Sequence, residues 1–301
     1  MKLAITGGTG FVGSHLIEIA SAAGHQINAL TRREQPARAR VNWINGDLSS
    51  REALEQLVDG ADAVIHVAGT ISAQSAAGFE IGNVAGTLAM LAAATAGGVQ
   101  RFVHVSSLAA REPKLSLYGG SKARAEELVH SSGLDWAIVR PPAVYGPGDR
   151  ETLELFRMAR LGLMLMPPKG RVSVIHADDL CRLLLALAGP AAPSSILIEA
   201  DDGKPGGWTH REFARALAAA VGTKAAVISS PGILLRLAAR ADQLMRGEKA
   251  KLTVDRAAYF SHRNWVIEPK RACPPKLWRP QVDTMEGLKD TADWYRAQGW
   301  L

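Results

Sequence analysis

Cysteine and long apolar runs are scarce in this chain of 301 residues. The two cysteines, Cys181 and Cys273, lie far apart and lack metal-ligating neighbours, which excludes a disulfide framework and a zinc site, so no metal is expected. No run of eighteen apolar residues appears, and we therefore expect no transmembrane segment. The apolar stretch before the first glycines is too short for a signal-peptide core, so a cytoplasmic location is expected.

Acidic residues are outnumbered, since 35 lysines and arginines stand against 29 aspartates and glutamates, for a net charge of +6. That balance favours anionic ligands such as phosphates. The basic residues are scattered apart from one group, Arg32, Arg33, Arg38 and Arg40, and aromatic residues do not alternate with them. We therefore expect a small-molecule substrate and no nucleic acid.

Three glycines follow the first apolar run. Gly7, Gly10 and Gly13 come directly after Lys2–Ile5, and a helical pattern begins at Leu16. Strand, glycine turn and helix together predict the first half of a dinucleotide site, in which helix N–H groups point at a pyrophosphate. We expect that a β-carbon at Gly7 or Gly10 would block the ligand. An ordinary strand-to-helix turn is the alternative.

Short strands and helical patterns then alternate through the first half of the chain. The predicted strands are 26–30, 41–44, 63–69, 101–107 and 136–140, and the longer helices are 83–96 and 117–130. This alternation predicts an α/β fold, a Rossmann-type doubly wound parallel sheet. Glycine and proline loosen the pattern beyond Tyr145, so we expect a dinucleotide-binding domain over 1–145. A smaller α+β substrate lobe is expected over 146–301, with segments near 172–200 returning to the first domain. Its predicted strands include 172–175 and 195–198.

The residues after the second strand bear on the choice of cofactor. An acid here would hold a ribose 2′-hydroxyl, whereas arginine accommodates a 2′-phosphate. Arg32, followed by Arg33, therefore favours NADP(H). Glu34 keeps NAD(H) open, and a solvated basic turn is the alternative.

Tyr118 and Lys122 lie four residues apart at a helix start, so they share one face. The ammonium is expected to lower the pKa of the phenol, which could then exchange a proton with a carbonyl or alcohol oxygen. Ser107, at the end of the fifth strand, could hold that same oxygen. Gly119 and Gly120 are unfavourable inside a helix, and we interpret them as room for a close ligand. A surface tyrosine beside an ordinary lysine is the alternative.

A basic amphipathic stretch over 233–245 offers two interpretations. It could lie on an anionic membrane, but a lobe helix that covers the substrate pocket is the commoner case and the one we favour.

These motifs resemble the extended branch of the short-chain dehydrogenase/reductase superfamily over nearly the whole chain. The resemblance covers Thr6–Gly13, Asn83–Thr87, Arg140–Gly148 and the Tyr118–Lys122 motif. It implies a catalytic set of Ser107, Tyr118 and Lys122. It also implies a cofactor-binding set, comprising Gly7, Thr9, Gly10, Phe11, Val12, Gly13, Arg32, Arg33, Asp47, Leu48, Val67, Ala68, Gly69, Lys122, Pro141 and Val144.

Two departures from the family pattern restrict which of the family's activities we expect. Ser107 and Tyr118 are only eleven residues apart, a shorter connection than most members have. Ala143 stands where nucleotide-sugar members carry asparagine, and Leu108 and Ala109 stand where dehydratases carry an acidic pair. The Arg140–Gly148 motif resembles those of hydroxysteroid dehydrogenases and dihydroflavonol reductases more closely, and these enzymes act on apolar carbon skeletons.

The resulting hypothesis is an NADP(H)-dependent oxidoreductase that moves a hydride between nicotinamide and a carbonyl or secondary alcohol of a small apolar substrate. An epimerase with retained NAD is one alternative, and a non-catalytic cofactor-binding regulator or assembly subunit is another. Either a monomer or a homodimer is expected.

Overall fold

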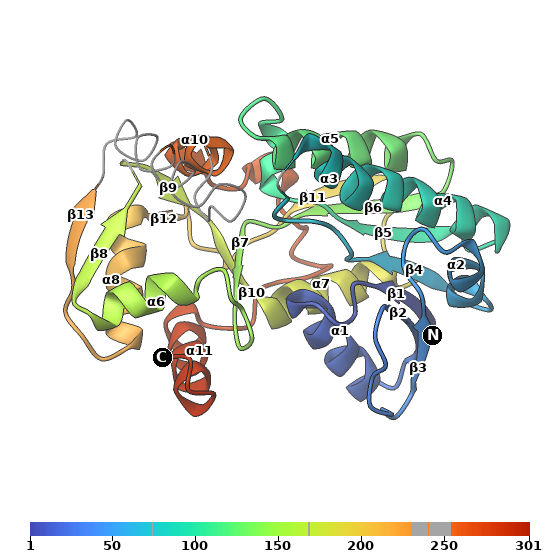
Figure 1. Ribbon diagram of the computed structural model, residues 1–301, viewed down its shortest axis with the longest axis horizontal. Helices are drawn as coiled ribbons and strands as arrows, with labels where there is room; N and C mark the ends of the chain where they lie inside the picture. Colours follow the sequence, from blue (N-terminus) through green and yellow to red (C-terminus); the bar gives the residue numbers. More distant parts are fainter. Residues whose placement is uncertain (74, 168, 230–239, 241–253) are drawn as a thin grey trace. The chain divides into compact units, whose positions relative to one another are not determined.

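The computed structural model describes residues 1–73, 75–167, 169–229, 240 and 254–301 (Figure 1). These residues divide into two compact units. The first comprises 1–141, 178–199 and 271–279, and the second comprises 142–177, 200–270 and 280–301. The expected boundary at residue 145 and the role of the second unit as a substrate lobe stay predictions.

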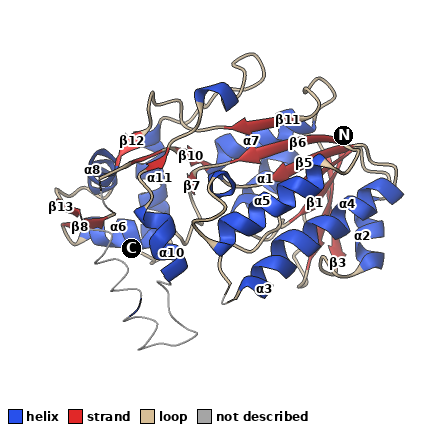
Figure 2. Cartoon of the chain, turned by 90° about the horizontal axis from the view of Figure 1, so that it is seen from above, coloured by secondary structure: helices blue, strands red, loops and turns tan. Residues whose placement is uncertain are grey.

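A parallel sheet of seven strands forms the centre of the first unit (Figures 1 and 2). Its spatial order is β3-β2-β1-β4-β5-β6-β11. The strands are β1 Lys2–Thr6, β2 Gln26–Thr31, β3 Val41–Asn45, β4 Ala63–His66, β5 Arg101–Val105, β6 Asp135–Arg140 and β11 Ile196–Glu199. Because helices cover both faces, the central strands β4 and β5 are buried along their whole length. This order confirms the predicted Rossmann-type sheet.

Helices cover the two faces of the sheet. On one face lie α1 Phe11–Ala22 and α7 Ala177–Ala188, which are in contact where Cys181 donates a hydrogen bond to the Val12 carbonyl oxygen. The other face carries α2 Arg51–Val58, α4 Gly86–Ala96 and α5 Leu117–His130 (Figure 1). Leu57, Met90 and Val129 from these three helices share one core with strand residues.

The helix predicted to begin at Asn83 begins earlier. A short helix α3, Ala76–Phe79, and a π-helical turn η1, Glu80–Ala85, lead without a break into α4. Among the described residues, the continuous stretch Ala76–Ala96 is the one helix long and apolar enough to cross a membrane by length and composition alone. Core helices of folded domains pass the same test, and this one buries Phe79, Met90 and Leu91.

The second unit contains small sheets packed with helices. β7 Ala143–Tyr145 pairs with β10 Val174–His176, β8 Leu163–Met166 pairs with β13 Ala226–Ser229, and β9 Arg171–Val172 lies between β12 Trp208–Thr209 and β14 Asn264–Trp265. The helices are α6 Leu153–Arg160, α8 His210–Ala220, α10 Val254–Ser261 and α11 Thr284–Ala297. α6, α8 and α11 share a core through Phe156, Leu217 and Tyr295.

One predicted strand of this unit was wrong in its extent. The stretch 172–175 is divided at Ser173 into β9 and β10, which belong to different sheets. The Ser173 backbone N–H donates to the Trp265 carbonyl, and its hydroxyl donates to Asp201 at 2.5 Å. These two bonds hold Ser173 at the point where the chain passes from one sheet to the other. The amphipathic stretch 233–245 lies outside the described residues, apart from residue 240.

Candidate active site

The glycine loop joins β1 to α1 and packs against the end of β4. Gly7 has a φ of +73°, and a β-carbon there would lie 2.7 Å from the Ala68 amide nitrogen. A β-carbon on Gly13 would collide with the Gly7 carbonyl oxygen. Gly7 and Gly13 are therefore required by the packing of the loop, before any ligand is considered.

The first turn of α1 has the features of an anion site. Gly10 caps the helix without a side-chain hydrogen bond, and no acidic residue occupies the first turn. The amino-terminal N–H groups are thus left without a side-chain partner, at the positive end of the helix dipole. This part of the predicted cofactor set, which includes Thr9, Phe11 and Val12, fits a dinucleotide diphosphate.

Other predicted cofactor residues lie at the carboxyl ends of neighbouring strands. Arg32 and Arg33 are exposed after β2. Asp47 accepts hydrogen bonds from the hydroxyl and the backbone N–H of Ser49, which lower its pKa, and the charge of Arg32 contributes further. Leu48 packs against Gly86, where a β-carbon would lie 2.6 Å from the leucine side chain.

The end of β4 brings this loop region to the predicted catalytic residues. Val67 and Ala68 lie against Gly7, and a β-carbon on Gly69 would be 3.7 Å from the Lys122 Nζ. Pro141, at the end of β6, accepts a hydrogen bond from the Leu108 N–H at 3.0 Å. Val144 lies in the second unit, where it pairs with Ile175 across β7 and β10.

The short connection after β5 brings Ser107 to Tyr118. Ser107 caps a 3₁₀ helix η2, Leu108–Arg111, and its hydroxyl accepts a hydrogen bond from the Ala109 N–H at 3.2 Å. Helix α5 begins after Ser116, which caps it through the Gly119 N–H at 2.9 Å. The Ser107 side chain hydrogen-bonds the phenol of Tyr118. A gap of eleven residues therefore leaves these two side chains in contact.

The expected effect of Lys122 on the phenol was wrong. The Lys122 ammonium donates a hydrogen bond to the Val105 carbonyl oxygen at 2.7 Å, and burial lowers its pKa to about 8, against an opposing effect of Glu126. Burial raises the pKa of Tyr118, and the hydrogen bond from Ser107 opposes that shift only in part. The phenol of this structure is therefore a weaker acid than an exposed tyrosine.

The glycine pair after Tyr118 also differs from the interpretation drawn from the sequence. A β-carbon on Gly119 would lie 2.6 Å from the Ala109 carbonyl oxygen, and one on Gly120 would lie 3.1 Å from the Pro113 carbonyl oxygen. The room provided by these glycines is occupied by the backbone of η2 and the turn after it. The pair thus permits the close packing of two chain segments rather than of a ligand.

A buried ionic network joins the elements that carry the predicted catalytic set. Glu126, one turn after Lys122 on α5, accepts hydrogen bonds from the Ser106 hydroxyl at 2.5 Å and from Arg140 at 2.6 and 2.8 Å. Glu199, at the end of β11, pairs with Arg140 at 3.6 Å and with Arg111 of η2 at 3.5 Å. All four charged side chains are at most 13% exposed. Sequence analysis missed this network, because its four charged residues come from four different elements and share no local spacing.

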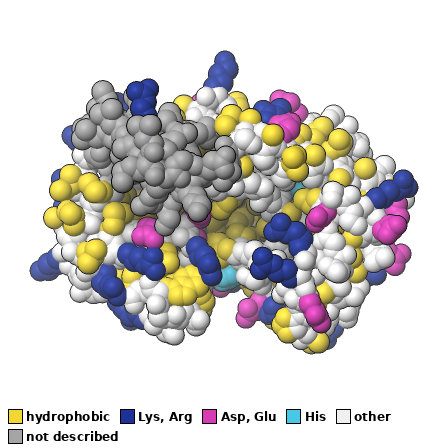
Figure 3. All heavy atoms as spheres, viewed as in Figure 1, with side chains coloured by type: hydrophobic (Ala, Val, Ile, Leu, Met, Phe, Trp, Pro, Cys, Tyr) yellow, Lys and Arg dark blue, Asp and Glu magenta, His cyan; other side chains and the backbone are white. Residues whose placement is uncertain are grey.

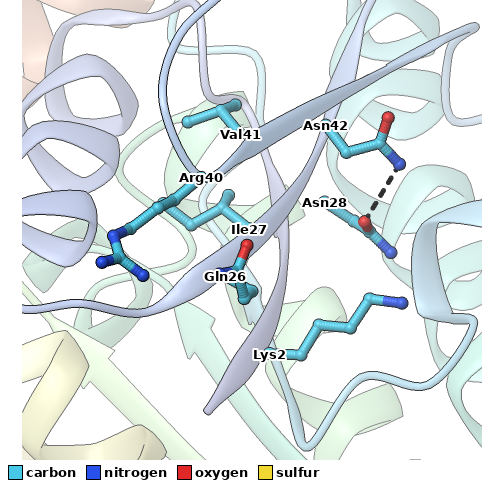
Figure 4. A pocket seen from close by; sticks show the side chains of 7 residues that line it. All are labelled: Lys2, Gln26, Ile27, Asn28, Arg40, Val41 and Asn42. Atoms are coloured by element: carbon cyan, nitrogen blue, oxygen red, sulfur yellow. Dashed lines mark hydrogen bonds between the residues drawn. The ribbon is translucent and has the colours of Figure 1, made fainter.

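A pocket of about 460 Å³ lies elsewhere, at the amino ends of β1, β2 and β3 (Figure 4). Its lining residues are Lys2, Gln26, Ile27, Asn28, Arg40, Val41 and Asn42. The amide of Asn42 donates to the Asn28 side-chain oxygen at 3.2 Å, and the Lys2 Nζ donates to the Asp59 carbonyl at 2.5 Å. These polar groups hold together the end of the sheet opposite the glycine loop.

Strand order and glycine loop define the class of this protein, an NAD(P)-dependent enzyme of the extended short-chain dehydrogenase/reductase type. Residues 3–195 match the model of the NAD dependent epimerase/dehydratase family, and the chain belongs to that family. The family resemblance inferred from the sequence motifs is thereby confirmed.

Curated relatives include reductases that match nearly the whole chain. Ceramide reductase of Caulobacter vibrioides (strain NA1000 / CB15N) is 38% identical over 99% of this chain and 96% of its own. 2-Alkyl-3-oxoalkanoate reductase of Stenotrophomonas maltophilia (strain K279a) is 30% identical over 96% of this chain and 98% of its own. Such relatives support oxidoreductase chemistry rather than a cofactor-binding protein without turnover.

Solved structures with little sequence identity share the fold. The Bordetella bronchiseptica enzyme WbmG, solved in complex with NAD, matches with a TM-score of 0.77 at 19% identity, over 100% of this chain and 95% of that chain.

Proposed function

We propose that this enzyme uses NADPH to reduce a ketone to a secondary alcohol in a substrate with a long apolar chain. The observation that carries the proposal is the hydrogen-bonded pair Ser107 and Tyr118 beside Lys122, at the end of β5. The names of two relatives support the substrate class, since ceramide and 2-alkyl-3-oxoalkanoates both carry hydrocarbon chains.

Each predicted catalytic residue has a role in this reduction. Tyr118 donates its phenolic proton to the substrate carbonyl oxygen, and Ser107 donates a hydrogen bond to the same oxygen. Lys122, on the cofactor side of α5, holds the nicotinamide ribose. The bound cofactor supplies the hydride that the carbonyl carbon receives, so hydride and proton together give the alcohol.

The proposed reduction needs a proton on Tyr118. Because burial raises the pKa of this phenol, it is protonated at neutral pH and can act as the acid that a reduction needs. Oxidation of an alcohol would need the phenolate, which the same burial disfavours. The protonated phenol is thus the form that the proposed reduction uses.

The residues that follow Ser107 argue against dehydratase chemistry. Leu108 and Ala109 are each 1% exposed, in place of the acidic pair of dehydratases. For the cofactor, exposed Arg32 and Arg33 at the end of β2 favour a 2′-phosphate, and hence NADPH.

The proposal is tested by following NADPH oxidation with the purified protein and three substrates: a long-chain 3-oxo amide, a long-chain 3-oxo acid and a nucleotide sugar. We expect turnover with the lipid-like ketones and none with the nucleotide sugar. Lack of turnover with any ketone would refute the proposal. Stoichiometric NAD retained through purification would instead indicate an epimerase.

A further inference from the structure

The second unit exposes one apolar sheet face, formed by β8 and β13. On β8, Leu163 and Leu165 are 45% and 53% exposed, whereas the alternate residues Met164 and Met166 are buried. β13 pairs with β8 in parallel and places Ile228, 51% exposed, opposite Leu165. Side chains at paired positions point to the same side of a sheet, so these residues form one surface.

We call this surface the β8–β13 face and define it as Leu161, Leu163, Leu165, Ala226 and Ile228. Leu161, which is 79% exposed, precedes β8, and Ala226 lies opposite Leu163. Figure 3 shows hydrophobic side chains gathered over the region where Figure 1 places β8 and β13. Neighbouring exposed apolar side chains of this kind are a feature of interaction sites.

Basic residues border one end of the β8–β13 face. Arg160 directly precedes Leu161, and Lys224 lies beside Gly162, whose carbonyl accepts the Ala226 N–H at 2.9 Å. Arg160 and Lys224 are exposed, and neither forms an ion pair with a described residue. Apolar side chains with a basic border are complementary to an anionic lipid surface, in which leucines enter the acyl boundary and cations meet headgroups.

We propose that the β8–β13 face docks on an anionic lipid bilayer, from which the enzyme takes its long-chain substrate. The membrane as the source of substrate rests on the proposed function, since a ketone with a long hydrocarbon chain partitions into lipid. Docking itself rests only on the exposed leucines, Ile228 and the two cations.

Vesicle flotation tests the docking directly, with vesicles of phosphatidylcholine alone and vesicles that also contain phosphatidylglycerol. We expect the full chain to bind the anionic vesicles, and a double variant, Leu163→Gln with Leu165→Gln, to bind at least about tenfold more weakly. The matched control is Ile71→Gln with Leu88→Gln, which removes two residues of the first unit that are 57% and 55% exposed. It is expected to bind as the unaltered protein does.

Charge is tested by a second pair, Arg160→Gln with Lys224→Gln, which is expected to weaken binding to anionic vesicles and reduce its salt dependence. Equal binding of the leucine variant and the control would overturn the proposal, as would failure of the unaltered protein to bind. A dimer that dissociates in the leucine variant, without vesicle binding, would identify a second copy as the partner and also overturn it. Because Leu163, Leu165, Arg160 and Lys224 are all exposed, both double variants are expected to unfold at the same temperature as the unaltered protein.

Activity measurements separate this proposal from the proposed function. A water-soluble short-chain ketone is reduced equally by the unaltered protein and the leucine variant if both proposals hold, whereas a vesicle-borne long-chain ketone is reduced more slowly by the variant. Vesicle binding without reduction of any ketone would refute the reductase and retain the docking. Reduction of a ketone without vesicle binding would refute the docking and retain the reductase.

Discussion

Lys122 gives the sharpest test of the electrostatics of the candidate site. Burial lowers its pKa from 10.5 to about 8, a shift that corresponds to about 3 kcal/mol at 1.36 kcal/mol per unit. Below pH 8 the folded and unfolded chains both carry the proton, and the full cost of the buried ammonium is present. Between pH 8 and 10.5 the unfolded chain holds a proton that the folded chain has lost, so the free energy of unfolding rises with pH.

The substitution Lys122→Met keeps the apolar stem and removes this titration. We expect the stability of the unaltered protein, relative to the variant, to increase by about 3 kcal/mol from about pH 7.5 to about pH 10.5. Urea unfolding of both proteins across this range measures the difference. Lys289→Met, at an exposed position of α11, is the matched control and should show no such change. If the two proteins differed in unfolding free energy by the same amount at every pH, the pKa shift assigned to Lys122 would be refuted.

Four further predictions concern single residues of the first unit. Tyr118→Phe is expected to lower kcat by at least about 10³-fold while the Kd for NADPH, measured by titration, stays nearly unchanged. Arg32→Ala should weaken NADPH binding by about tenfold and leave NADH binding nearly unaltered, which a Kd ratio would show. Gly119→Ala places a β-carbon 2.6 Å from the Ala109 carbonyl and should lower the free energy of unfolding in urea by about 1–3 kcal/mol. Glu199→Ala removes a buried carboxylate that pairs with both Arg111 and Arg140 and should cost about 3–5 kcal/mol in the same assay.

Local patterns were enough to predict the bounds of several elements in the first unit. The predicted helix 117–130 has the same bounds as α5, and the predicted strand 41–44 ends one residue before β3. Both elements are bounded by glycine or by a capping residue close in sequence, and their apolar residues follow the period of the element itself. Strand order then followed because alternating strands and helices permit few topologies.

Interactions between distant segments could not be predicted in the same way. The sequence shows Lys122 one helical turn from Tyr118, but it does not show the Val105 carbonyl to which the ammonium donates. It shows the cost of Gly119 in a helix, but not that the Ala109 backbone occupies the space. In both cases the contact that decides the outcome comes from another element, which local spacing in the sequence does not reveal.

The shortened connection between Ser107 and Tyr118 shows what such distant contacts accomplish. The connection contains η2, which is tied at its far end by Arg111 to Glu199 on β11. Arg140 then links Glu199 to Glu126, and Glu126 holds Ser106, the neighbour of Ser107. Two arginines balance two glutamates, so burial of the network is tolerated only while all four charges are present. Glu199 lies 92 positions after Ser107, and its loss would remove one partner from each of the two arginines and so weaken the tie between η2 and β11.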